Sequence, residues 1–385
     1  MKKISLASDT ITQKELFNLS NWIKKSSKLT MGKKTLEFER KWSNWLGMKY
    51  SVFLNSGSSA ILASFQSLKE MKKLKNNKIV IPALCWSTDF STLTQLGFES
   101  IICDCNLKDL SVSLSELEKI FKNYNPSALL LVSVLGLVPD MKSILYLCKK
   151  YNVILIEDTC ESVGSKFNGK KLGTFGYCSF FSFYYGHHIS TIEGGMVSTN
   201  SKDFYNVLLS VRSHGWSRNM NDKYRKKLEK KYNISKFESS FTFYYRGFNF
   251  RPTEIQAFLG LMQLKKINKI IKIRFNNFKY FTKKLKNNIW KFSFDYKKTI
   301  ISNMGFPIIS KNRDLIIKEM NLNNIENRPL ISGSLKKQPF FRDHSINKNN
   351  LPNADKIHSY GFYLPNHHNI KKKDIDRMLK ILERF

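Results

Sequence analysis

Two adjacent histidines, His187 and His188, lie in a segment rich in hydroxyl and glycine residues. The segment runs Ser179-Phe-Phe-Ser-Phe-Tyr-Tyr-Gly-His-His-Ile-Ser-Thr-Ile-Glu-Gly-Gly195. An imidazole can move a proton near neutral pH, so either ring is a candidate general acid or base. Neighbouring side chains of an extended segment point in opposite directions, which argues against a metal ion held by both. We expect no metal at this segment.

Two further residues could contact a flat, charged ring. Asp158 follows the apolar run Val153-Ile-Leu-Ile156, and Trp86 stands in Pro82-Ala-Leu-Cys-Trp-Ser-Thr88. A carboxylate just beyond a strand can meet a protonated ring nitrogen, although a helix cap remains the alternative. An indole can stack on such a ring, although a core tryptophan remains the alternative.

A small-residue turn, Asn55-Ser-Gly-Ser-Ser-Ala60, follows the strand-like run Tyr50-Ser-Val-Phe-Leu54 and opens an apolar helical stretch. The first turn of a helix presents free N–H groups and the positive end of the helix dipole, which suits a phosphate. Gly57 and Ser58 are the candidate ligands. An ordinary turn with no ligand fits the same residues.

The elements that must position these residues alternate between short apolar strands and helical patterns. Strands are expected at 50–54, 78–82, 100–103, 129–134, 153–156 and 196–199. Ser113 and Glu116 have the spacing of a capping box, which predicts a helix to about residue 121. This rhythm predicts an α/β fold, with a mostly parallel sheet covered by helices on both faces. Ligands of such sheets bind beyond the carboxyl ends of the strands, where the motifs above would meet.

The pattern of expected strands and helices changes near residue 250. We expect a large α/β domain over 1–250, with residues 1–28 as an N-terminal arm. A smaller α+β domain is expected over 251–385, because helical patterns through residue 285 are followed there by short mixed elements.

The composition excludes a disordered chain, but it does not decide between two explanations of the high positive charge. Of 385 residues, 64 are Lys or Arg and 30 are Asp or Glu, a net charge of +34. The charge fits either a polyanionic partner or a general bias of composition, and its even spread favours the bias. We expect neither nucleic acid nor a membrane as a partner. Six cysteines without a CxxC pair, and an N-terminus without an apolar signal core, predict free thiols in the cytoplasm.

Taken in order, the motifs resemble the DegT–StrS family of pyridoxal-phosphate-dependent sugar aminotransferases. Arg246-Gly-Phe-Asn-Phe-Arg251 and Leu29-Thr-Met-Gly32 extend the likeness. The resemblance implies an aspartate-aminotransferase-like fold of type I. It also implies site roles: Asp158 pairs with the ring nitrogen, Trp86 stacks on the ring, and the phosphate is held by Gly57, Ser58, Ser182 and, from the neighbouring subunit of a homodimer, Asn249.

One departure from the family pattern predicts the reaction. Family aminotransferases carry a lysine five residues after the phosphate-binding serine, where this chain has His187. Histidine cannot form the imine that the lysine forms. The change is similar to that in the family's sugar 3-dehydratases. The resemblance then implies bound pyridoxal or pyridoxamine phosphate, glutamate as the amino donor, and His187 as the catalytic base.

The same resemblance implies a substrate. It is a nucleotide-linked 4-keto-6-deoxy sugar, with GDP-4-keto-6-deoxy-D-mannose expected, which loses its 3-hydroxyl. The product would serve the synthesis of colitose for surface polysaccharide such as O-antigen. Residues expected to line the substrate pocket are Glu161, His188, His214 and Arg328, each with a structural role as the alternative. Another nucleotide, such as CDP, remains open.

Three alternatives remain at the level of sequence. One related dehydrase carries an iron–sulfur cluster, whose cysteines lie after the histidine motif. This chain has no cysteine after Cys178, so no cluster is expected. An aminotransferase would need a displaced lysine, with Lys166 or Lys170 as candidates. The third alternative is a catalytically silent homologue that binds a sugar nucleotide.

Overall fold

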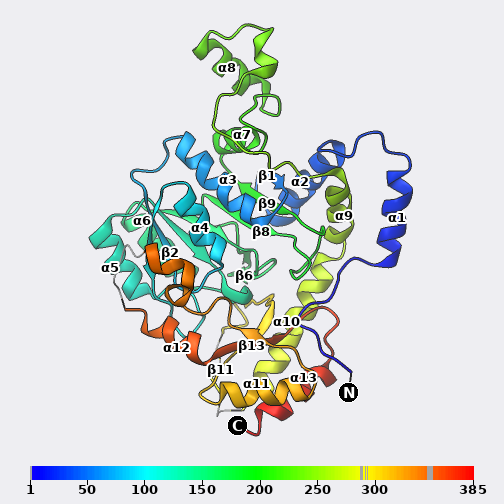
Figure 1. Ribbon diagram of the computed structural model, residues 1–385, viewed down its shortest axis with the longest axis vertical. Helices are drawn as coiled ribbons and strands as arrows, with labels where there is room; N and C mark the ends of the chain where they lie inside the picture. Colours follow the sequence, from blue (N-terminus) through cyan, green and yellow to red (C-terminus); the bar gives the residue numbers. More distant parts are fainter. Residues whose placement is uncertain (1, 287–288, 291, 293, 345–349) are drawn as a thin grey trace.

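The fold is built around a central β-sheet. The computed structural model describes residues 2–286, 289–290, 292, 294–344 and 350–385. Within these ranges the largest sheet has seven strands in the order β1-β9-β8-β5-β4-β2-β3 (Figure 1). Their bounds are β1 Tyr50–Leu54, β2 Lys78–Pro82, β3 Glu99–Cys103, β4 Ala128–Val132, β5 Ile154–Asp158, β8 Cys178–Ser182 and β9 Gly195–Thr199.

The direction of the strands brings the predicted motifs to one edge. β2, β3, β4, β5 and β8 pair in parallel, and β9 runs antiparallel between β1 and β8. Six of the seven strands therefore end at the same edge of the sheet. The predicted mostly parallel sheet is confirmed.

Helices cover both faces of the sheet. α3 (Gly57–Glu70) packs against β8 and β9, and α4 (Ser87–Gln95) packs against β3. The remaining helices of this part are α2 (Lys33–Leu46), α5 (Leu114–Tyr124), α6 (Met141–Lys150), α7 (Lys202–Val211) and the short 3-10 helix η1 (Val134–Gly136).

The capping box expected at the start of α5 is wrong. Ser113 is the N-cap residue, but its side chain makes no capping hydrogen bond. The Ser113 hydroxyl lies 3.3 Å from the hydroxyl of Ser115 instead. A nearby hydroxyl competes with the backbone N–H as a partner, which spacing alone does not reveal.

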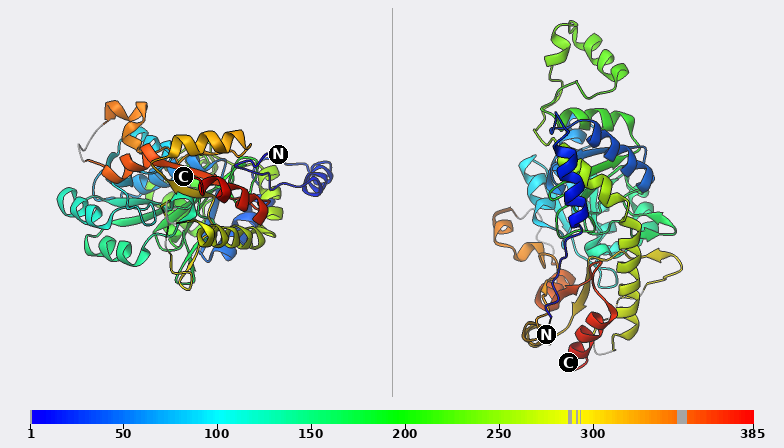
Figure 2. Two further views of the ribbon diagram at one scale, coloured as in Figure 1. Left: turned by 90° about the horizontal axis from the view of Figure 1, so that it is seen from below. Right: turned by 90° about the vertical axis from the view of Figure 1, so that its right-hand side faces the viewer.

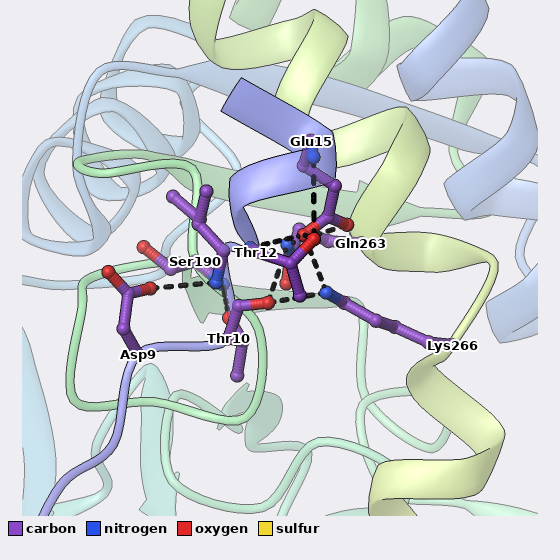
Figure 3. Close-up of polar contacts among 8 residues, drawn as sticks. Asp9, Thr10, Thr12, Glu15, Ser190, Gln263 and Lys266 are labelled. Carbon is purple, nitrogen blue, oxygen red and sulfur yellow. Dashed lines mark hydrogen bonds and ion pairs between the residues drawn. The ribbon is translucent and has the colours of Figure 1, made fainter. Parts of the chain in front are cut away.

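The N-terminal segment contacts the rest of the protein both through α1 and through the residues before it. α1 (Gln13–Ile23) packs on α9 (Glu254–Leu264), where the rings of Trp22 and Phe258 stack 4.9 Å apart. Ahead of α1, the Thr10 hydroxyl accepts the Ser190 N–H, and its carbonyl accepts from Lys266 (Figure 3). The predicted arm is therefore docked on the body of the protein, beside the loop that carries the two histidines.

The described residues from 267 onward build a second layer below the main sheet (Figures 1 and 2). Long α10 (Ile267–Lys284) leads to a small antiparallel sheet of order β11-β13-β12. The elements are β11 (Gly305–Ile309), β12 (Arg328–Pro329), β13 (Gly361–Pro365), α11 (Arg313–Leu322), α12 (Pro352–Tyr360), α13 (Lys372–Leu382), η3 (Leu335–Lys337) and η4 (Pro339–His344). The boundary at residue 250 stays a prediction, and α9, which follows it, packs on α1 and α2.

The rest of the fold lies at the periphery. β6 (Lys166–Phe167), β7 (Lys170–Lys171) and β10 (Thr299–Ile300) form a minor sheet. α8 (Asp222–Tyr232), followed by η2 (Glu238–Phe241), projects beyond α7 and away from the main sheet (Figures 1 and 2). Among the described residues, no helix is both long and apolar enough to cross a membrane. All six cysteines are free thiols.

Candidate active site

A cavity of about 460 Å³ opens at the carboxyl edge of the main sheet. Its walls come from the ends of β1, β4, β5 and β8, and from the small antiparallel sheet. Most of the predicted site residues line it, namely Gly57, Ser58, Trp86, Asp158, Glu161, Ser182, His187 and Arg328. The sheet thus brings together motifs that are up to about 270 positions apart in the chain.

The start of α3 forms one end of the cavity. Ser56 caps the helix by accepting the Ser59 N–H, so the first-turn N–H groups of Gly57 and Ser58 have no acceptor within the helix. A Cβ added to Gly195, the first residue of β9, would lie 2.0 Å from the Ser56 carbonyl oxygen. Because glycine permits this approach, the helix end sits tightly between two strands. The arrangement is suited to an anion.

Trp86 presents an open ring to the cavity. The residue is 58% exposed, which is high for a tryptophan, and it stands at the N-cap of α4. Its backbone N–H donates to Asp89 Oδ2 at 3.0 Å, which fixes the main chain beneath the ring. The alternative of a core tryptophan is wrong, because the ring faces the cavity.

Asp158 is the last residue of β5 and is only 6% exposed. It accepts the Cys160 N–H at 2.8 Å. Burial raises the pKa of the Asp158 carboxyl, while hydrogen bonds from Cys160 and Asp89 work in the opposite direction. The carboxyl end of β5 thus holds an acid that gains from a cationic partner.

Asp89 is a cavity residue that sequence reasoning missed. It is fully buried, and its Oδ2 accepts the Trp86 N–H at 3.0 Å. An acid in the first turn of a helix is typically a cap, and Asp89 does cap α4 by accepting the Trp86 N–H. Because that ordinary function explains the residue, the sequence did not indicate its place in the cavity wall.

His187 lines the cavity as a half-buried ring. Burial, helped by the charge of Arg274, lowers the pKa of His187 to about 4, and the backbone of Cys160 partly opposes this. The imidazole is therefore neutral near neutral pH and can accept a proton. Within the described part of the chain, no lysine lines this cavity.

Glu161 and Arg328 also line the cavity. Glu161 accepts the Leu135 N–H at 2.6 Å, and burial raises its pKa to about 8. A group with this pKa is mostly a neutral acid near neutral pH. Arg328 begins β12 and is paired in register with Tyr363 of β13, which also lines the cavity.

Three predicted site residues do not line the cavity of their own chain. The His188 ring is fully buried, and its Nε2 lies 2.8 Å from the Ser302 carbonyl oxygen. His214 packs its ring on Trp216, with centroids 5.2 Å apart. Asn249 is exposed, and its side-chain oxygen accepts from Arg251 at 2.9 Å. The roles predicted for these residues stay predictions.

The N-terminal segment supplies a wall that the sequence did not indicate. Leu6 and Ala7 line the cavity, and the Leu6 N–H donates to Glu326 at 2.9 Å. Ile4 forms a bridge with Ile325, which precedes β12. These long-range pairings have no local sequence signal.

The residues present fit pyridoxal phosphate. An exposed indole can cover a ring, a buried carboxyl can meet a ring nitrogen, and the amides at the start of α3 with the Ser182 hydroxyl can bind a phosphate. For a metal ion the described residues offer no group of three or more His, Cys, Asp or Glu side chains.

Residues 10–383 match the family model described as the DegT/DnrJ/EryC1/StrS aminotransferase family. The chain belongs to this family. A relative named GDP-4-keto-6-deoxy-D-mannose 3-dehydratase, from Escherichia coli O55:H7, is 32% identical over 369 residues. The match covers 93% of this chain and 94% of the relative.

Two solved structures of family members share the fold over nearly the whole chain. One is a GDP-4-keto-6-deoxymannose-3-dehydratase with a trapped PLP–glutamate geminal diamine, with a TM-score of 0.88 at 30% identity. The other is a variant of such a dehydratase with bound GDP-perosamine, with a TM-score of 0.86 at 30% identity. Each match covers 98% of this chain and 99% of the other. The predicted aminotransferase-like fold is confirmed.

Proposed function

We propose that the chain is a pyridoxal- or pyridoxamine-phosphate-dependent 3-dehydratase. It removes the 3-hydroxyl of a nucleotide-linked 4-keto-6-deoxy sugar, with GDP-4-keto-6-deoxy-D-mannose as the substrate. One observation carries the proposal: His187, and no lysine of the described chain, faces the cavity that fits the cofactor. Without a lysine amine at the ring, the site cannot form the imine of an aminotransferase. Such a site is suited to removing the 3-hydroxyl of the sugar rather than to transferring an amino group to it.

Five residues would hold the cofactor. Asp158 accepts the proton of the ring nitrogen, and Trp86 stacks on the ring. The Gly57 and Ser58 amides and the Ser182 hydroxyl bind the phosphate. Pyridoxamine phosphate, when bound, supplies an amino group for the 4-keto carbon and an electron sink for departure of the 3-hydroxyl.

His187 moves the proton. Burial and the charge of Arg274 disfavour the charged form, so the imidazole is neutral and can accept a proton. Glu161, a neutral acid in the same cavity, lies where it can donate a hydrogen bond to the sugar. The Arg328 guanidinium binds the diphosphate of the nucleotide, because its planar set of N–H donors matches the spacing of the phosphate oxygens.

The relatives support the choice of substrate and amino donor. The dehydratase structures named above hold GDP-perosamine in one case and a PLP–glutamate geminal diamine in the other. GDP as the nucleotide and glutamate as the donor follow for this chain from that similarity. The route to colitose for O-antigen is the corresponding biosynthetic setting.

The aminotransferase alternative requires a lysine at the ring. Lys166 and Lys170 lie in β6 and β7, which pair with each other, and Lys166 is opposite Ile300 of β10. Neither lines the cavity. The structure therefore favours the dehydratase over this alternative.

A homodimer with shared sites completes the proposal. Asn249 is exposed and lies outside the cavity of its own chain, so it is free to approach a second copy. We assign the phosphate contact to Asn249 of the partner subunit. Six unpaired thiols support the cytoplasm as the compartment.

A panel experiment tests the proposal. The purified protein, given pyridoxal phosphate and glutamate, is expected to change from the aldehyde to the amine absorbance. With GDP-4-keto-6-deoxy-D-mannose it is then expected to release ammonia, and CDP- and dTDP-linked 4-keto-6-deoxy sugars serve as competitors. Covalent trapping of the cofactor by borohydride in the wild type, with loss of trapping in Lys166→Met or Lys170→Met, would establish the aminotransferase alternative instead.

A further inference from the structure

Residues 4–7 join the second layer of the protein to the cavity, and main-chain hydrogen bonds hold their start. The Ile4 N–H donates to the Asn324 carbonyl at 2.9 Å, and the Ile4 carbonyl accepts the Glu326 N–H at 3.0 Å. The Ile4 side chain is 4% exposed and belongs to the main hydrophobic core. This part of the chain therefore has a fixed place beside residues 324–326.

The Glu326 carboxylate holds the next residues of the segment. Its Oε2 accepts the Leu6 N–H at 2.9 Å, and its Oε1 lies 2.5 Å from the Lys3 ammonium. The Lys3 ammonium and the Leu6 N–H lower the pKa of Glu326, and the charge of a cavity residue two positions later, Arg328, lowers it further. The group is therefore an ionised acceptor near neutral pH.

Side chains of the second layer anchor the segment on both sides of residues 6–7. The His367 Nε2 donates to the Ser5 carbonyl at 3.1 Å, while the Nδ1 of the same ring accepts the Asn369 N–H at 3.2 Å. The Asn369 side-chain amide donates to the Ser8 hydroxyl at 2.8 Å. The two residues that line the cavity are thus fixed from both directions along the chain.

The residues that line the cavity differ in polarity according to the part of the fold they come from. Those at the edge of the main sheet are mostly polar, as Ser58, Asp158 and Ser182 illustrate. Apart from Arg328 and Tyr363, those from the N-terminal segment and the second layer are apolar, namely Leu6, Ala7, Met304, Pro329 and Ile331. The cavity therefore has an apolar wall, to which the N-terminal segment contributes.

A 6-deoxy sugar carries a methyl group at carbon 6, where the parent sugar carries a hydroxymethyl group. An apolar wall accepts the methyl group, but it would remove water from a hydroxyl without offering a hydrogen bond. We propose that Leu6 and Ala7 are specificity-determining residues: held by Glu326, they belong to the wall that receives the 6-methyl group of the sugar. Glu326 is then a positioning residue. The inference rests on the proposed function for the class of substrate.

The first test compares two GDP-sugars that differ only at carbon 6 and cannot react, because neither has a 4-keto group. The wild type, loaded with pyridoxamine phosphate, is expected to bind GDP-6-deoxy-D-mannose about tenfold more tightly than GDP-D-mannose in calorimetric titrations. Leu6→Asn and Ala7→Ser add a polar group to the wall and are expected to bring the two affinities within about twofold of each other. Ser8→Ala is the control and should keep the wild-type ratio, because Ser8 does not line the cavity.

The second test examines Glu326. Glu326→Gln keeps an oxygen for the Leu6 N–H and is expected to retain the preference for the 6-deoxy sugar, whereas Glu326→Ala is expected to reduce it to about twofold. Glu319→Ala is the matched control, because Glu319 pairs with Arg384 at 2.9 Å with similar exposure in the same layer and does not line the cavity. All three variants are expected to bind pyridoxamine phosphate like the wild type, since the contacts assigned to the cofactor come from the main sheet.

The ratio of the two affinities separates this role from a merely structural one, because a general loss of folding weakens binding of both sugars alike. Equal affinities in the wild type, or a wild-type ratio in both Leu6→Asn and Ala7→Ser, would overturn the proposal. An unchanged ratio in Glu326→Ala would exclude Glu326 as the positioning residue.

The proposed function can fail separately from this inference. If the wild type dehydrates GDP-4-keto-6-deoxy-D-mannose but binds the two probe sugars equally, only the inference about the apolar wall is refuted. If the wild type does not dehydrate that substrate, the proposed function is refuted, and the ratio of the two affinities still decides whether the wall selects the methyl group.

Discussion

Gly57, the first residue of α3, packs directly on Ser182, the last residue of β8: a Cβ on Gly57 would lie 2.8 Å from the Ser182 Cβ. The two residues are far apart in the chain, yet both line the cavity. Their contact sets the spacing between helix amides and a hydroxyl that we assign to the phosphate. The size of residue 57 therefore controls the phosphate site.

Gly57→Ala is expected to weaken binding of pyridoxamine phosphate by about tenfold and to cost about 1–3 kcal/mol of unfolding free energy, because the methyl group overpacks the contact. Gly186→Ala is the control, since its added Cβ would have a nearest neighbour at an ordinary 3.5 Å. Fluorescence titration and thermal unfolding measure both effects. Unchanged binding in Gly57→Ala would remove residue 57 from the phosphate site.

His187→Asn is expected to abolish dehydration, with a loss of about 10²-fold or more, because the amide cannot accept a proton. Binding of pyridoxamine phosphate should persist, since cofactor contacts lie elsewhere in the cavity. His187→Lys should allow borohydride to attach the cofactor covalently to the chain, as mass spectrometry would show. Dehydration by the Asn variant at the wild-type rate would exclude His187 as the base.

Trp86→Ala is expected to weaken cofactor binding about three- to tenfold through loss of ring stacking, while Trp86→Phe keeps most of the affinity. The free energy of unfolding should change little, because the side chain is 58% exposed. Equal affinities of the Ala and Phe variants and the wild type, measured by titration, would contradict the stacking role.

Glu161 should make stability depend on pH. Its pKa is raised from 4.5 to about 8, so the unfolded chain loses this proton at lower pH than the folded chain does. Stability is therefore expected to fall as pH rises between these values, by on the order of 5 kcal/mol for this group. Urea unfolding of Glu161→Gln should show a flatter pH profile. A profile parallel to that of the wild type would show that Glu161 is ionised in the folded state.

The sequence predicted the parts of the site that follow strands. Asp158, Ser182 and the turn at Gly57 stand directly after apolar runs, and parallel strands end at one edge. The expectation of a 3-dehydratase rather than an aminotransferase came from a single residue, His187. Such features are local in sequence, so their types and spacing were sufficient.

Other parts of the site could not be predicted because they depend on packing between distant segments. Leu6 reaches the cavity only because the N-terminal segment pairs with residues near β12. Asp89 reaches the cavity only in the folded chain, where α4 packs against α3 and β3. His188 and His187 are neighbours in sequence, but one ring lies in the core and the other lines the cavity. The backbone there is not the extended segment that the sequence suggested, because a turn closes with the hydrogen bond from the His187 N–H to the Tyr184 carbonyl.

The pairing of β1 with β9 has a consequence for how the protein assembles. Residues 50–54 find their partners at 195–199, and β9 then pairs with β8 at 178–182. Loop closure over such separations slows folding, and the nucleus of the sheet can form before this step. The part of the cavity that we assign to the phosphate is thus expected to form late in folding. A nascent chain shorter than about two hundred residues would contain the motifs up to His187 but could not yet form a site that binds the cofactor.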